Sequence, residues 1–168
     1  MIENPLFPNE LKGLRGWLVL LGWGVVLTAT TSVATTALVF NRIFSNGAWE
    51  SFITVGSEVY DPLFASFLIW EIIYNSAIII ASLYLISFFF SKHYFFPKFY
   101  IAFVAVYLIL VPLDIWLITL VLPDDYMGVG RAIAVAPNFI ALPIWIPYLL
   151  LSKRVKATFV EKMPNKSN

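Results

Sequence analysis

The stretch of sequence that decides the fold is residues 63–90, which read LFASFLIWEIIYNSAIIIASLYLISFFF. Glu71 is the only charged residue in this stretch, and no proline interrupts it. A helix needs about 20 apolar residues to cross the roughly 30 Å hydrocarbon core of a bilayer. A barrel strand would be about 10 residues long and would alternate in polarity. The stretch therefore predicts a membrane-spanning helix.

Three further stretches on either side have the same apolar character, at roughly 16–40, 99–122 and 129–151. Only helices and closed barrels satisfy every backbone polar group within lipid. We therefore predict an all-α fold, a four-transmembrane-helix bundle that forms a single integral membrane domain over residues 1–168. A long loop, residues 41–62, joins the first two helices, and a basic tail, residues 152–168, follows the fourth. We expect the fourth helix to continue into this tail from Ser152 to Glu161.

Composition supports a lipid-facing exterior. Hydrophobic residues make up 60% of the chain, charged residues make up 12%, and the mean hydropathy is +0.83. A soluble domain has about 45–50% apolar and about 25% charged residues. The net charge of +1 argues against a nucleic-acid partner. The chain has no cysteine and a single histidine, His93, so we expect no disulfide framework, no metal site and no cofactor.

Charged residues outside the four stretches differ in sign between the two sides. Basic residues precede the first helix, lie between the second and third, and follow the fourth: Lys12, Arg15, Lys92, Lys98, Lys153, Arg154, Lys156, Lys162 and Lys166. Acidic residues dominate the first and third loops: Glu50, Glu58, Asp61, Asp124 and Asp125. Short loops rich in lysine and arginine stay in the cytoplasm. Both termini are therefore predicted to be cytoplasmic.

A few polar residues fall within the predicted spans. Ionisable groups cost about 2.5–3.5 kcal/mol there on insertion scales, so each needs an explanation. At 1.5 Å per residue, Glu71 and Asp114 lie roughly 12 Å below the outer boundary, and Arg131 lies roughly 5 Å below it. Asn75 is one turn from Glu71, and Asn138 shares a helix face with Arg131. We predict that these five residues form an intramembrane polar cluster.

Two other polar patterns accompany this cluster. On the second helix, one face carries residues at helical spacing: Phe64, Glu71, Asn75, Ile78 and Ser82. A partly polar face on an apolar helix is expected to point into the bundle. The first helix carries a run of hydroxyls: Thr28, Thr30, Thr31, Ser32, Thr35 and Thr36. Such hydroxyls can bond their own backbone or let helices approach closely, and we favour that interpretation over a pore lining.

Three segments resemble a known family. They are Gly16-Trp17-Leu18, Phe95-Phe96-Pro97-Lys98, and the run from IWIPY at 144–148 to SKRVKATF at 152–159. The chain is similar over most of its length to the small bacterial membrane proteins called domain of unknown function 2569. The resemblance implies a four-helix inner-membrane protein of bacteria. It implies no activity, and it supplies no site residues.

Several functional hypotheses remain open. The first is a non-enzymatic membrane protein that binds a membrane or periplasmic protein partner or serves as an accessory subunit. The second is an oligomeric ion- or proton-coupled transporter or channel, built from copies of the chain, in which Glu71 and Asp114 bind the cation. The polar cluster would then be functional, whereas the first hypothesis needs it only to hold helices together. Because the acids outnumber Arg131, one would carry a proton or face water. An enzyme acting on lipid is least favoured, because no nucleophile accompanies these acids.

Overall fold

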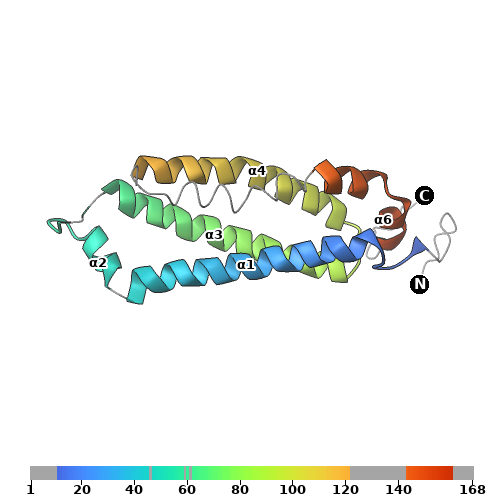
Figure 1. Ribbon diagram of the computed structural model, residues 1–168, viewed down its shortest axis with the longest axis horizontal. Helices are drawn as coiled ribbons and strands as arrows, with labels where there is room; N and C mark the ends of the chain where they lie inside the picture. Colours follow the sequence, from blue (N-terminus) through green and yellow to red (C-terminus); the bar gives the residue numbers. More distant parts are fainter. Residues whose placement is uncertain (1–10, 46, 59, 61, 122–142, 161–168) are drawn as a thin grey trace, which may run out of the picture.

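The computed structural model describes residues 11–45, 47–58, 60, 62–121 and 143–160. In chain order its elements are α1 (Trp17–Ser45), α2 (Ala48–Ile53), α3 (Pro62–Phe90), α4 (Phe96–Val121), a helical stretch at residues 143–151, and α6 (Lys153–Thr158). The central helix α3 packs against both α1 and α4 along the long axis of the molecule (Figure 1). Helix α2 lies at one end of this bundle, and α6 lies at the other.

The helices agree with three of the four predicted spans. The second and third begin within a few residues of the predicted positions, and α1 continues past Phe40 to Ser45. Of the fourth predicted span, residues 143–151 are helical, and the rest lies outside the described residues. The predicted first loop contains a short helix, α2, which hydropathy alone did not distinguish.

Large apolar side chains are exposed along the outside of the long helices. Leu38 is 63% exposed and Ile109 is 69% exposed. Each apolar Å² left in water costs about 25 cal/mol, a cost that disappears in hydrocarbon. Within the described residues, three helices are long and apolar enough to cross a membrane, over Trp17–Leu38, Pro62–Phe90 and Phe96–Leu117. The chain is therefore a multi-pass membrane protein.

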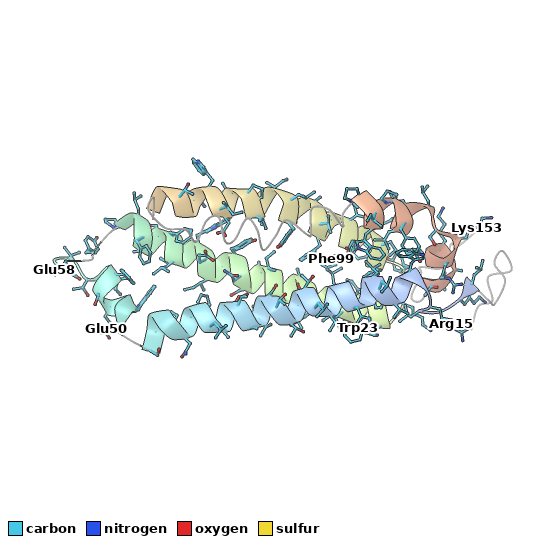
Figure 2. All side chains as sticks on the ribbon, in the orientation of Figure 1. Arg15, Trp23, Glu50, Glu58, Phe99 and Lys153 are labelled. Carbon is cyan, nitrogen blue, oxygen red and sulfur yellow. The ribbon has the colours of Figure 1, made fainter. Side chains whose placement is uncertain are left out.

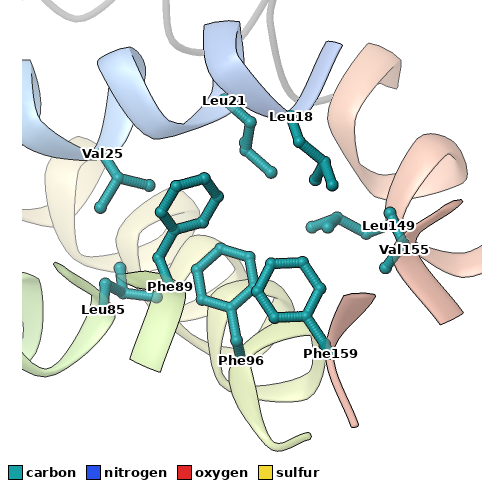
Figure 3. Close-up of a cluster of buried hydrophobic side chains, with 9 residues drawn as sticks. All are labelled: Leu18, Leu21, Val25, Leu85, Phe89, Phe96, Leu149, Val155 and Phe159. Atoms are coloured by element: carbon teal, nitrogen blue, oxygen red, sulfur yellow. The ribbon is translucent and has the colours of Figure 1, made fainter. Parts of the chain in front are cut away.

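A cluster of buried apolar side chains lies at the α6 end of the bundle (Figure 3). Side chains from all the elements at this end meet there: Leu18, Leu21, Val25, Leu85, Phe89, Phe96, Leu149, Val155 and Phe159. The rings of Phe96 and Phe159 stack with centroids 4.6 Å apart, and Phe89 meets Phe96 edge-on at 5.2 Å. We call these nine residues the aromatic core. It connects α1, α3 and α4 to the end of the chain.

The tail does not extend the last helix straight outward, as the sequence suggested. That expectation was wrong, because Ser152 adopts an extended conformation and ends the helical stretch. The Ser152 side chain accepts a hydrogen bond from the Val155 backbone N–H and so caps α6. Val155 and Phe159 are then buried in the aromatic core, and the Gly13 backbone N–H donates to the Thr158 hydroxyl at 3.1 Å. The turn brings the tail back onto the bundle.

Charge separates between the two ends of the molecule (Figure 2). Arg15 and Lys153 lie at the α6 end, whereas Glu50 and Glu58 lie at the α2 end. The tight connection from α3 to α4, which contains Lys92 with φ of 52°, also lies at the α6 end. Basic segments that are far apart in the sequence are thus brought to one end of the bundle.

Two glycines of α1 allow a matched test of helix packing. A Cβ on Gly22 would lie 2.5 Å from the Phe89 ring, which is only 2% exposed, whereas a Cβ on Gly24 would meet nothing within 4 Å. Alanine improves helix propensity by about 1 kcal/mol at either position. We expect Gly22→Ala to lower the free energy of unfolding by about 1–3 kcal/mol through overpacking. Gly24→Ala should leave it unchanged or raise it.

Denaturation of the purified protein in mixed micelles, followed by circular dichroism, measures both variants against the wild type. Equal stability of the two variants would contradict the assigned contact between Gly22 and Phe89.

Candidate functional site

Two carboxylic acids lie buried within the apolar spans. Glu71 on α3 and Asp114 on α4 are each 6% exposed. At 1.5 Å per residue, Glu71 lies about 13 Å from the start of α3, and Asp114 lies about 10 Å from the end of α4. Since the start of α3 and the end of α4 lie at the same end of the bundle (Figure 1), both acids lie at a similar level, nearer to α2.

Glu71 belongs to a hydrogen-bond network between α3 and α1. The Asn75 side-chain amide donates to Glu71 Oε2 at 2.6 Å and to the Glu71 carbonyl at 2.8 Å. The spacing of four residues stacks the two side chains on one face of α3. The Thr36 hydroxyl on α1 then donates to Asn75 Oδ1 at 3.3 Å. Asn75 thereby joins an acid on its own helix to a hydroxyl on the neighbouring helix.

Asp114 is linked to α3 through the residue before Glu71. The indole N–H of Trp70 donates to Asp114 Oδ1 at 3.4 Å, and the Trp70 ring stacks on Tyr74 at 5.9 Å. Neighbouring positions on α3 thus make polar contacts with helices on both of its sides. We call Thr36, Trp70, Glu71, Asn75 and Asp114 the polar layer.

The polar layer overlaps with the cluster predicted from the sequence. Glu71, Asn75 and Asp114 lie in it, and among the described residues Asn75 donates to Glu71 whereas Trp70 donates to Asp114. The other two predicted members, Arg131 and Asn138, lie outside the described residues.

Two residues of the layer were not identified from the sequence. Trp70 was counted as part of an apolar run, although an indole N–H in lipid needs an acceptor and Glu71 is its neighbour. Thr36 was grouped with the other hydroxyls of α1. Thr28, Thr30, Thr31 and Thr35 bond carbonyls of their own helix, as that interpretation proposed, and Thr36 instead reaches across to α3.

The chemistry available to this layer is that of a buried carboxyl group that accepts hydrogen bonds, among the residues described, from the neutral donors Asn75 and Trp70. Such a group can bind a proton or a cation within the membrane. Over the described ranges, no three histidine, aspartate or glutamate side chains gather closely enough to hold a metal ion. Asn75 and Trp70 supply N–H donors, which suit a carboxyl oxygen rather than a metal.

Residues 11–160 match the family described as Protein of unknown function (DUF2569). The chain belongs to the DUF2569 family. This confirms the resemblance seen in the sequence, and the match runs from just before α1 to the residue after Phe159. Comparison with curated proteins and with solved structures finds no match to this chain. The family description assigns no activity, so the polar layer must be interpreted from its own chemistry.

A pair of neighbouring threonines tests the link between α1 and α3. Thr36→Val keeps the side-chain shape and removes the donor to Asn75, whereas the Thr35 hydroxyl bonds only carbonyls of α1 among its hydrogen bonds in the structure described here. Hydrogen bonds between helices in lipid are worth about 0.6 kcal/mol on average and up to about 1.7 kcal/mol. We expect Thr36→Val to lower the free energy of unfolding in micelles by an amount in that range. Thr35→Val should leave it within error, and an equal loss in both variants would contradict the network.

Proposed function

We propose that the chain is a bacterial inner-membrane protein with four spanning helices and cytoplasmic termini, which acts without catalysis by binding a partner protein at its outer surface. The charge separation of the two ends supports this orientation. Lysine and arginine gather at the α6 end, and the exposed acids Glu50 and Glu58 gather at the α2 end. By the positive-inside rule, the α6 end faces the cytoplasm and α2 faces the periplasm.

The observation that carries the partner-binding role is the fixed position of α2. The ring of Phe52 lies 4.3 Å from that of Phe64 on α3, and the ring of Trp49 lies 5.4 Å from that of Phe44 on α1. These contacts hold α2 in place against α1 and α3. Ordering a loop in this way costs conformational entropy, and a loop that only connects two helices would not need to be ordered.

At the end of α2 and in the turn after it, apolar side chains face outward. Ile53, the last residue of α2, is 42% exposed, Val55 is 78% exposed, and Glu50 and Glu58 lie nearby in the sequence. Exposed apolar groups beside charged ones are typical of protein interaction surfaces. Because α2 is already ordered in the free protein, a partner would bind this surface without a large loss of conformational entropy.

Because the chain contains no cysteine, a single Val55→Cys substitution gives one reactive site. We expect a membrane-impermeant maleimide–benzophenone reagent to label it in intact bacterial cells and, after illumination, to yield a discrete protein adduct. The matched variant Lys98→Cys, in the first turn of α4, should be labelled only after lysis. Labelling of Lys98→Cys in intact cells would contradict the orientation, whereas labelling of Val55→Cys without an adduct would contradict the partner.

A second candidate function rests on the polar layer. Burying the ionisable residues Glu71 and Asp114 within the membrane costs free energy. Neutral polar residues could hold the helices together without that cost. In this alternative the chain is an oligomeric proton- or ion-coupled carrier or channel, and the two acids bind the proton or cation. Several copies would be needed, because a few helices enclose little room for a pathway.

Proteoliposomes with an internal pH-sensitive dye test this alternative. If Glu71 or Asp114 transfers protons, Glu71→Gln and Asp114→Asn should reduce the pH-driven flux of the wild type to the rate of empty liposomes, because an amide does not titrate. Glu50→Gln, an exposed acid outside the layer, is the matched control and should retain flux. Flux that persists in both layer variants would exclude these acids from the pathway.

A further inference from the structure

An open groove of about 390 Å³ lies between α1 and α3 near the α6 end of the bundle. Its floor contains the buried residues Gly22 and Phe89, which contact each other because Gly22 has no side chain. Its rim is formed by Val19, Trp23 and Phe90, which are 43%, 63% and 57% exposed. In the described part of the chain, every residue that lines the groove is apolar or glycine. The groove therefore suits a hydrocarbon occupant.

The groove lies within a single leaflet of the membrane. The residues that α1 contributes run from Val19 to Val26 at helical spacing, which places them on one face over about 10 Å. Helix α3 contributes only its last two residues, Phe89 and Phe90. Half of a hydrocarbon core about 30 Å thick is about 15 Å. The groove thus occupies the leaflet at the α6 end and reaches the level where α3 ends.

Basic residues flank the groove at this end. Leu14 and Phe90 line it, Lys12 and Arg15 lie within two residues of Leu14, and Lys92 lies two residues after Phe90. Lysine and arginine at the ends of membrane helices attract anionic lipid headgroups. The end of the groove at the membrane surface is therefore suited to a negatively charged group.

No acid among the described residues competes for these cations. Arg15 is exposed and lies beyond Trp23 toward the α6 end (Figure 2). The acids that the structure describes all lie nearer to α2: Glu50, Glu58, Glu71 and Asp114. The positive charge beside the groove is thus available to an external anion.

This charge distinguishes between the possible occupants of the groove. A second copy of the chain, inserted in the same orientation, would place its own basic end beside this one, and like charges repel. A spanning helix of another protein usually carries lysine or arginine at its cytoplasmic end, which is the α6 end in the orientation proposed above. An anionic phospholipid combines an apolar chain with a negative headgroup and so matches both parts of the site.

We propose that this groove binds an acyl chain of an anionic phospholipid, whose headgroup is held by Arg15 together with Lys12 and Lys92. The chain covers the contact between Gly22 and Phe89 on its lipid-facing side. The site is separate from the partner surface at α2 and from the polar layer, and its binding can be measured in micelles without reference to the orientation of the protein.

Quenching of Trp23 fluorescence by lipids with brominated acyl chains reports occupancy of the groove in the full-length protein in uncharged micelles. The difference between wild type and Trp23→Phe isolates this signal. We expect brominated phosphatidylglycerol to half-saturate the quenching at a lower mole fraction than brominated phosphatidylcholine with the same chains. Trp116 on α4, which is 56% exposed and outside the groove, is the control. Its quenching, isolated with Trp116→Phe, should not distinguish the two lipids.

A pair of basic residues tests the headgroup contact. Arg15→Gln should reduce the preference for phosphatidylglycerol at Trp23 about fivefold, the effect of one basic residue near an anionic headgroup. Lys153 is also exposed at the α6 end but lies apart from Arg15 (Figure 2), so Lys153→Gln should leave the preference unchanged. Equal half-saturation by the two lipids in the wild type, or an equal loss in both variants, would overturn the proposal.

A pair of valines on α1 tests the groove itself. Val19→Phe adds bulk at the rim and should abolish the preference, whereas Val33→Phe makes the same change outside the groove at a similarly exposed position and should retain it. Full preference in a folded Val19→Phe would contradict the assigned groove. Absence of lipid quenching at Trp23 in a protein that is dimeric would show that a second copy covers the groove instead. If Val19→Phe does not fold, Arg15→Gln and Lys153→Gln decide alone.

Discussion

Close approach of α1 to α3 at Gly22 is the contact on which the rest of the packing depends. Lipid solvates apolar side chains about as well as another helix does, so burial alone gives little drive for helices to associate in a membrane. Close fit between the surfaces of the helices must therefore favour their association. Because Gly22 has no side chain, the Phe89 ring packs directly against α1. Phe89 contacts Phe96 edge-on, and Phe96 stacks on Phe159. This series of contacts runs from α1 through α3 and α4 to the end of the chain.

The opposite half of the bundle is joined by hydrogen bonds instead. Thr36 bonds Asn75 across α1 and α3, and Trp70 bonds Asp114 across α3 and α4. Each such bond is worth about 0.6 kcal/mol in lipid, less than the packing contacts. Their directionality, however, fixes how α1 and α4 are rotated about their axes relative to α3. A cavity of about 120 Å³ lies between these two regions and is lined by residues of α1, α3 and α4.

The sequence predicted the features that one helix determines by itself. Length and hydropathy located α1, α3 and α4, and a period of 3.6 residues predicted the buried face of α3, where Glu71, Ile78 and Ser82 are indeed buried. It did not predict the turn at Ser152, because the residues after it continue a helical pattern. Contacts made only in the folded bundle, such as those of Phe159 with Phe89 and Phe96, make the return favourable. Nor did it distinguish Thr36 from Thr35, since their difference depends on where α3 lies.

The structural and the functional interpretations of the polar layer are compatible at the level of single atoms. Asn75 donates to Oε2 of Glu71, and an oxygen accepts this bond whether the acid is ionised or carries its proton on Oε1. The same holds for the bond from Trp70 to Oδ1 of Asp114. Neither bond has to break if a proton arrives or leaves, although each is stronger when the acid is ionised, so the helices can stay joined through such a cycle. Lysine or arginine in place of Asn75 and Trp70 would hold these acids more firmly and would also keep them ionised. Neutral donors at both positions therefore join the helices without requiring either acid to keep one charge.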